Sequence, residues 1–256
     1  MEFLKSQQVK SGVMLIELNR PEKRNALNND TLQELVTLLK SVDADSNIKT
    51  VVITGNESCF AAGADLNELA ALDVVSIQQD QRPLLWKQID EFSKPIIVAV
   101  NGFAFGAGFE LALHGDIVLT GENAQFALPE IGLGMLPGAG GTQRLARSVG
   151  QQLTMRWAMT GERISAQTAL QHGITSQICP TQLTVQYAIE LAEKIAKQAP
   201  LAIRVIKQSL KSIHEVTLSQ GLKQERQHFV WLAATQDRQE GINAFLEKRQ
   251  PNFRGV

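Results

Sequence analysis

The chain has 256 residues, which is enough for one large domain or two small ones with a sizeable core. It carries 25 basic and 26 acidic residues, so it lacks the basic surplus typical of proteins that bind nucleic acid. Cys59 and Cys179 are too far apart to indicate a disulfide scaffold, and the four histidines show no metal-ligand spacing. We find no apolar run near the roughly 18 residues of a membrane span, and no signal-peptide core. We therefore expect a soluble, cytoplasmic protein without a metal.

Predicted strands and helices alternate through the first part of the chain. Apolar runs predict strands at 3–9, 12–18, 50–54, 96–100, 116–119 and 173–178. Helical periodicity predicts a helix capped by Asp30, and further helices at 74–93, where Pro83 marks a start or a break, from about Ala107, and at 141–149, 151–160 and 165–172. From residue 183 the pattern is helical alone, with helices expected at 183–198, 201–214, 216–234 and 238–248. This order indicates an α/β core, residues 1–196, followed by a helical region, residues 197–256.

The stretch 95–144 combines glycines with two carboxylates in apolar surroundings. Gly106 and Gly108 precede Glu110, and Glu130 lies in the sequence Leu-Pro-Glu-Ile. Carboxylates are seldom buried without a partner, so two in such settings favour a site for acid–base chemistry. The alternatives are that Glu110 decorates a helix start and that Glu130 is a solvated turn residue. Both alternatives remain open from the residues alone.

The glycine-rich bend has a use of its own if a helix starts near Ala107. The free backbone N–H of residue 107 would then lie beside the Glu110 carboxylate, one helical turn away. That is an oxyanion donor next to a proton carrier. A nucleotide-phosphate site is the competing interpretation. The first glycine cluster lacks the third glycine of a dinucleotide fingerprint, and the cluster at 138–142 lacks the lysine of a phosphate loop.

Seven segments, in order, resemble the crotonase superfamily and within it the enoyl-CoA hydratases. The matching segments are 19–27, 60–66, 94–102, 106–110, 129–134, 137–144 and 240–249. Together they cover nearly the whole chain. The resemblance implies a crotonase-like α/β fold, a right-handed spiral of strand–strand–helix turns whose C-terminal helices drive trimer formation. Two such trimers commonly stack into a hexamer, so a homotrimer or a dimer of trimers is expected.

The resemblance also implies roles for individual residues. The backbone N–H groups of Ala64 and Ala107 would form an oxyanion hole, with Glu110 as base and Glu130 as acid. Position 107 is alanine where many relatives carry glycine, which a backbone donor tolerates unless its φ is positive. Coenzyme A is part of the substrate, so no separate cofactor is expected. Residues implied to bind the substrate are Lys23, Arg24, Ala26, Ala62, Asp65, Leu66, Asn67, Pro129, Gly138, Phe245 and Lys248.

Three activities compete within this resemblance. A hydratase needs both carboxylates, whereas a double-bond isomerase or another acyl-CoA lyase of this superfamily can work with one. An RNA-binding relative without catalysis would favour a basic face, and the net charge of −1 argues against it. The presence of Glu110 and Glu130 favours hydration. The resemblance further implies a six-carbon dicarboxylic enoyl-CoA, with Arg82 or Lys87 as candidate anchors unless both are solvated surface charges.

Overall fold

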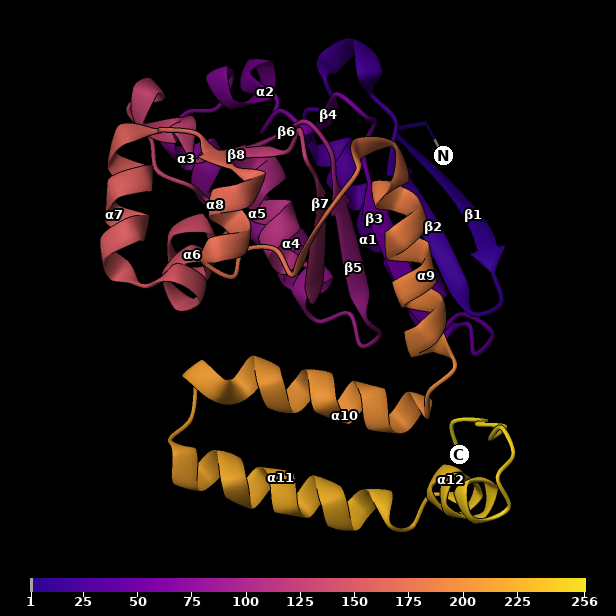
Figure 1. Cartoon of the computed structure of the whole chain (residues 1–256). Helices are drawn as coiled ribbons and strands as arrows, with labels where there is room; N and C mark the ends of the chain where they lie inside the picture. Colours follow the sequence, from indigo (N-terminus) through magenta and orange to yellow (C-terminus); the bar gives the residue numbers. More distant parts are fainter. Residues whose placement is uncertain (1) are drawn as a thin grey trace.

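A six-stranded sheet forms the centre of the protein in the computed structural model, which describes residues 2–256 (Figure 1). Its strands, in spatial order, are β1 (Leu4–Lys10), β2 (Val13–Leu18), β3 (Thr50–Thr54), β5 (Ile96–Val100), β7 (Ile117–Gly121) and β10 (Gln177–Cys179). Strand β1 runs antiparallel to β2, and the other neighbours are parallel. Every residue of β3 and β5 is buried. This explains why these strands appear in the sequence as continuous apolar runs.

A second sheet of four short strands lies beside the first and was not predicted. It consists of β4 (Cys59–Ala61), β6 (Phe103–Phe105), β8 (Gln125–Ala127) and β9 (Ile164–Ser165). Segments of two or three residues are too short to show an alternating pattern, so they cannot be recognised from periodicity. Strands β3, β5 and β7 are each followed by a short strand of the second sheet and then by helices. The predicted strand–strand–helix repeat is therefore present.

Between residues 2 and 196, nine α-helices follow the strands or connect them. They are α1 (Asn29–Ala44), α2 (Leu66–Ala70), α3 (Val74–Gln78), α4 (Arg82–Asp90), α5 (Ala107–His114), α6 (Gly141–Val149), α7 (Gln151–Thr160), α8 (Ala166–Gln171) and α9 (Thr184–Ala196). One expectation needs correction. Asn28, not Asp30, caps α1, because its Oδ1 accepts from the Thr31 N–H at 2.9 Å. The segment predicted to be helical at 74–93 forms the two helices α3 and α4, and Pro83 lies in the first turn of α4, so the break expected at Pro83 is present. The Asp80 side chain accepts from the Arg82 N–H at 2.9 Å where α4 begins.

Two apolar cores flank the large sheet. The larger core packs α1, α4 and α5 against one face, around residues such as Leu35, Ile53 and Phe109. The smaller core lies between the other face and α9, where Ala188 and Ala192 pack on Val52 and Ile97. Helices α4 and α5 are thus fixed by burial. This matters because α5 carries Ala107 and Glu110 of the site described below, and α4 carries Arg82, which contacts the segment that follows Ala64.

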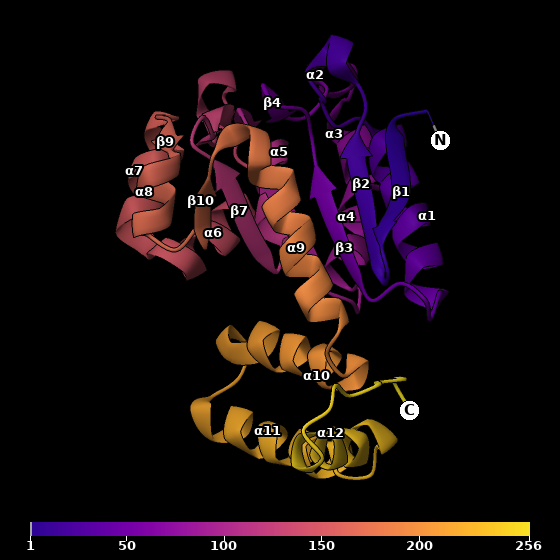
Figure 2. The same cartoon turned by 45° about the vertical axis from the view of Figure 1, so that its right-hand side comes forward.

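The last three helices lie apart from the sheets, at one end of the molecule (Figures 1 and 2). They are α10 (Pro200–Lys211), α11 (Leu218–Leu232) and α12 (Gln236–Leu246). Ion pairs join α10 to the core, with Lys207 Nζ 2.7 Å from Asp116 Oδ2 and Lys211 Nζ 2.9 Å from Asp90 Oδ1. A domain boundary at residues 196 and 197 stays a prediction, as does the trimerisation role of this region. Within residues 2–256, no helix is both long and apolar enough to cross a membrane.

We expect these helices to hold copies of the chain together. The side chains of Phe229, Val230 and Trp231 on α11 are 65%, 56% and 52% exposed. Apolar surface of this size is costly to leave in water, and association would bury it. Light scattering at micromolar concentration should report a trimer or hexamer, and Trp231→Glu should shift the protein towards smaller species. A wild-type monomer under these conditions would contradict the prediction.

Candidate active site

Glu110 is a buried carboxylate at the start of α5. The helix begins at Ala107 because Gly106 adopts φ 49°, a backbone conformation that turns the chain out of β6. Glu110 is only 2% exposed, and its Oε1 accepts the backbone N–H groups of Ala139 and Gly141, both at 2.7 Å. Burial raises the pKa of Glu110, although these two amides and the charge of Arg144 act in the opposite direction. Glu110 is therefore not a solvated helix-start residue.

Glu130 lies in the short helix η2 (Pro129–Leu133), and its environment differs from that of Glu110. Its Oε2 is buried and has no hydrogen-bond partner within residues 2–256. Burial, together with the nearby charge of Glu110, raises the pKa of Glu130 to about 7. Two backbone amides and the charge of Arg144 favour the charged form of Glu110, whereas only the backbone of Glu130 itself opposes the effect of burial on Glu130. The pair therefore suits one charged and one protonated carboxyl group.

The two predicted oxyanion donors, the N–H groups of Ala64 and Ala107, are far apart in sequence but close in space. The Leu27 N–H donates to Gly63 O at 2.8 Å, so the trans peptide directs the Ala64 N–H the opposite way. Within residues 2–256, the N–H groups of Ala64 and Ala107 donate to no backbone or side-chain acceptor. Ala107 is not among the residues with positive φ, so alanine is compatible with this position. Both amides are thus available to a ligand.

A glycine brings these amides and the Glu130 carboxyl together. A Cβ atom placed on Gly106 would lie 2.8 Å from Glu130 Oε1 and 3.8 Å from Gly63 Cα. The Gly63–Ala64 and Gly106–Ala107 peptide groups are therefore close to each other and to the Glu130 carboxyl group. Glu110 follows one turn later on α5. Two free donors beside two carboxyl groups can stabilise a developing oxyanion and move protons.

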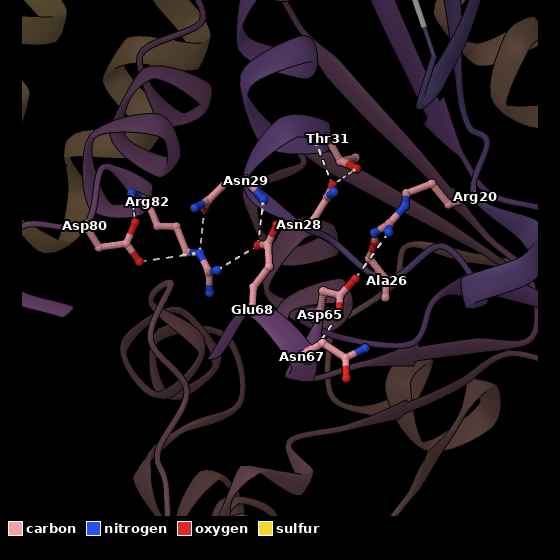
Figure 3. A network of polar contacts seen from close by, with 10 residues as sticks. All are labelled: Arg20, Ala26, Asn28, Asn29, Thr31, Asp65, Asn67, Glu68, Asp80 and Arg82. Carbon is pink, nitrogen blue, oxygen red and sulfur yellow. Dashed lines mark hydrogen bonds and ion pairs between the residues drawn. The ribbon is translucent and has the colours of Figure 1, made fainter. Parts of the chain in front are cut away.

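The loops predicted to bind coenzyme A lie side by side next to this centre. The Ala62 N–H donates to Arg24 O at 3.0 Å, and Arg20 Nη2 lies 3.2 Å from Asp65 Oδ2 (Figure 3). Lys23 and Arg24 are exposed, as a site for a phosphorylated ligand requires, and Ala26 is half-buried between them and the core. The other predicted residues near the centre are the exposed Leu66, Asn67, Pro129 and Gly138.

Residues 8–256 match the family described as enoyl-CoA hydratase/isomerase. The chain belongs to this family. It is 55% identical over 243 residues to the 2,3-dehydroadipyl-CoA hydratase of Escherichia coli strain K12, covering 95% of each chain. It is 46% identical to the mitochondrial enoyl-CoA hydratase of Pongo abelii, covering 94% of this chain and 83% of the relative.

Solved structures of this family have the same fold. The crystal structure of enoyl-CoA hydratase subunit I from Geobacillus kaustophilus superposes with a TM-score of 0.96 at 38% identity, over 100% of both chains. That of enoyl-CoA hydratase from Bacillus anthracis gives 0.95 at 36% identity, over 99% of this chain and 100% of the other. The predicted family, crotonase-like fold and enzyme class are therefore confirmed. The role of each site residue stays a prediction that the geometry supports.

Two predicted residues of this family member lie far from the centre. Phe245 is on α12 and 83% exposed, and Lys248 follows the same helix with φ 55°. Helix α12 lies at the end of the molecule opposite α2 (Figures 1 and 2). A single chain therefore does not bring Phe245 and Lys248 to the predicted coenzyme A loops. Sequence motifs could not show this, because they carry no information on where the last helices pack.

Arg82 and Lys87, the two candidate partners for a terminal carboxylate of the substrate, both pair with glutamates of the protein. The Arg82 side chain is only 12% exposed, and its Nη2 lies 2.9 Å from Glu68 Oε2 (Figure 3). Lys87 is 68% exposed and pairs with Glu91 at 3.6 Å, as expected of a solvated charge. Arg82 is therefore engaged in a contact within the protein, and Lys87 behaves as a solvated surface charge. The partner of Arg82 is not apparent from sequence, because it lies in a separate helix.

The segment 137–144, which imitates a phosphate loop, has a function that the sequence did not reveal. Its Ala139 and Gly141 amides hold the Glu110 carboxylate. The nearby His114, one of the four histidines without metal-ligand spacing, is a packing residue. It is 4% exposed, its ring centroid lies 5.0 Å from that of Trp86, and burial lowers its pKa to about 4.

The raised pKa of Glu130 predicts a pH-dependent cost to folding. The folded protein binds this proton more tightly than an unfolded chain, for which the ordinary value is 4.5. The contribution of Glu130 protonation to folding stability is complete below pH 4.5 and is lost as pH rises through about 7.

We expect Glu130→Gln to be more stable than the wild type at pH 8, by about 1–3 kcal/mol, and to lose that advantage at low pH. Thermal unfolding at pH 4.5 and 8 tests this, with exposed Glu122→Gln as the control. An equal difference at both pH values would contradict it.

Proposed function

We propose that this protein is an enoyl-CoA hydratase that adds water to a 2-enoyl-CoA and gives a 3-hydroxyacyl-CoA. The observation that carries the proposal is the meeting of two free amides, those of Ala64 and Ala107, with the carboxyl groups of Glu110 and Glu130. The most similar relatives described above carry the names of hydratases. Coenzyme A is part of the substrate.

The geometry supports a mechanism of water addition. Attack of water at C3 places negative charge on the thioester oxygen, and the Ala64 and Ala107 N–H groups would stabilise it. The N-terminus of α5 adds its positive dipole end. Glu110, whose charge two amides favour, would take the proton from water. Glu130, which is readily protonated, would deliver a proton to C2.

An isomerase is the second activity that the family description allows. Isomerisation moves a proton between two carbons and can use one carboxyl group. Here Oε2 of the second carboxyl group, Glu130, is buried, has no hydrogen-bond partner within residues 2–256, and feels the charge of Glu110. Burying a polar atom without a hydrogen-bond partner destabilises the folded protein, so we expect this carboxyl group to have a function. Hydration uses both groups and is therefore favoured.

For the acyl group we propose a six-carbon dicarboxylic chain, that of 2,3-dehydroadipyl-CoA. The support is the 55% identity to a relative with that name. Arg82 pairs with Glu68 and Lys87 is a solvated charge, so the proposal does not depend on either residue as an anchor. The test compares kcat/KM for 2,3-dehydroadipyl-CoA, 2-hexenoyl-CoA and crotonyl-CoA. We expect the dicarboxylate to be preferred over the six-carbon monocarboxylate, which controls for chain length. A preference for crotonyl-CoA would overturn the acyl assignment and leave hydration standing.

A further inference from the structure

The segment between the oxyanion donor Ala64 and helix α4 has almost no apolar anchor. Helices α2 and α3 contain no buried residue. Leu66, Val74 and Ile77 are 52%, 73% and 56% exposed. Because burial does not fix this segment, its position depends on polar contacts. The contacts of its two ends therefore decide where α2 lies.

Those contacts converge on Arg82 and Glu68 (Figure 3). Arg82 Nη2 lies 2.9 Å from Glu68 Oε2, Arg82 Nε donates to Asn29 Oδ1 at 2.7 Å, and Nε also lies 3.4 Å from Asp80 Oδ2. The same Glu68 Oε2 accepts the Asn29 N–H at 3.0 Å. Asn29 is the first residue of α1 and Arg82 the first of α4, and both helices are fixed in the core. Glu68 is thus held between two rigid elements.

This cluster lies close to the Ala64 amide along the chain. Leu27, two residues before Asn29, donates to Gly63 O at 2.8 Å and accepts from the Asp65 N–H at 3.1 Å, on either side of Ala64. Helix α2 starts directly afterwards, and Glu68 lies in its first turn. Fixing Glu68 against Asn29 therefore fixes the chain just after Ala64 to the chain just after Leu27.

We propose that Arg82 is a positioning residue that, through Glu68, holds the oxyanion donor Ala64 in place. The inference rests on the proposed function, because it gives the Ala64 amide its catalytic role. A guanidinium suits the task, since its planar fork reaches Glu68 and Asn29 at once, which a lysine ammonium does less well. Without it, the carboxylates of Glu68 and Asp80 lose the cation between them. Helix α2 then shifts, and a displacement near 1 Å at a catalytic donor can cost about 100-fold in rate.

The experiment measures kcat and KM for crotonyl-CoA and 2,3-dehydroadipyl-CoA in Arg82→Met, Arg82→Lys and Glu68→Ala. The matched control is Arg156→Met, which breaks the ion pair between the exposed Arg156 on α7 and Glu162 just after that helix. We expect Arg82→Met to lower kcat by at least about 10-fold with little change in KM, since the donor acts mainly in the transition state. Arg82→Lys should keep part of the rate. Arg82→Met combined with Glu68→Ala should be no worse than the more damaging single change.

A second readout separates positioning from mere stability. A chromophoric cinnamoyl-CoA absorbs at longer wavelength when its thioester carbonyl is polarised by the two amides. We expect this shift to be smaller in Arg82→Met than in the wild type and unchanged in Arg156→Met. A wild-type kcat and a wild-type absorbance shift in Arg82→Met would overturn the proposal, as would a loss confined to thermal stability.

If Arg82→Met does not fold, the same two measurements on Arg82→Lys and Glu68→Ala test the proposal. A wild-type protein without hydration would instead refute the proposed function, and the ligand shift would still report on the amides.

Discussion

Glu110→Gln and Glu130→Gln should each lower kcat/KM for hydration by at least about 100-fold while keeping the fold and ligand binding. Glutamine preserves the shape of each side chain but can neither take a proton from water nor deliver one to carbon. At position 110 it also replaces the charged acceptor of the Ala139 and Gly141 amides with a neutral one. The measurement is steady-state hydration of a 2-enoyl-CoA, followed by the loss of its conjugated absorbance.

The control for these variants is Glu122→Gln, which makes the same change at an exposed position after β7. Binding of a saturated acyl-CoA, which cannot be hydrated, should stay within a few-fold of the wild type in all three proteins. Near-normal turnover of either Glu110→Gln or Glu130→Gln would rule out a mechanism that needs both carboxyl groups.

Gly108→Ala should damage stability and activity together. A Cβ atom at position 108 would lie 2.2 Å from Ala61 O and 2.8 Å from Ala61 Cβ, so α5 packs on β4 without room for a methyl group. Helix α5 would have to move away, and it carries both the Ala107 amide and Glu110. We expect unfolding to become easier by about 1–3 kcal/mol. We also expect kcat/KM to fall by about 100-fold, because the site tolerates little displacement.

Gly221→Ala on α11 is the matched control for that change. Its added Cβ would meet nothing closer than Val216 Cγ2 at 3.8 Å, and alanine favours a helix over glycine. Its melting temperature should equal or exceed that of the wild type. An unchanged melting temperature and unchanged activity in Gly108→Ala would show that the α5–β4 contact does not position the site.

The elements with a strong periodic signal were predictable from sequence. Strand β5 and helix α5 appear where the apolar run and the glycine bend placed them, because burial and turn chemistry act locally. Strands β6 and β8 were missed, because three residues cannot display a period. The cap of α1 was misplaced from Asn28 to Asp30, since both are good caps and only the hydrogen bond to Thr31 decides.

The identity of the site residues was predictable from sequence, whereas the contacts that position them were not. The motifs named Glu110 and Glu130, yet the amides that hold Glu110 come from a loop about 30 residues later. The sequence leaves Arg82 as either a candidate substrate anchor or a solvated charge, because its partner Glu68 lies in another helix and no local pattern joins them. Charges on a helix look alike in sequence whether they meet solvent, substrate or another side chain. Their partners are set by tertiary packing alone.

Hydration in isotopically labelled water tests the assigned reaction most directly. The purified protein would be mixed with a 2-enoyl-CoA in water enriched in oxygen-18, and the product analysed by mass spectrometry. The two-carboxyl site predicts a 3-hydroxyacyl-CoA with the label on C3, formed by the wild type and at least about 100-fold more slowly by Glu130→Gln. An unlabelled 3-enoyl-CoA as the main product would instead show an isomerase and contradict hydration.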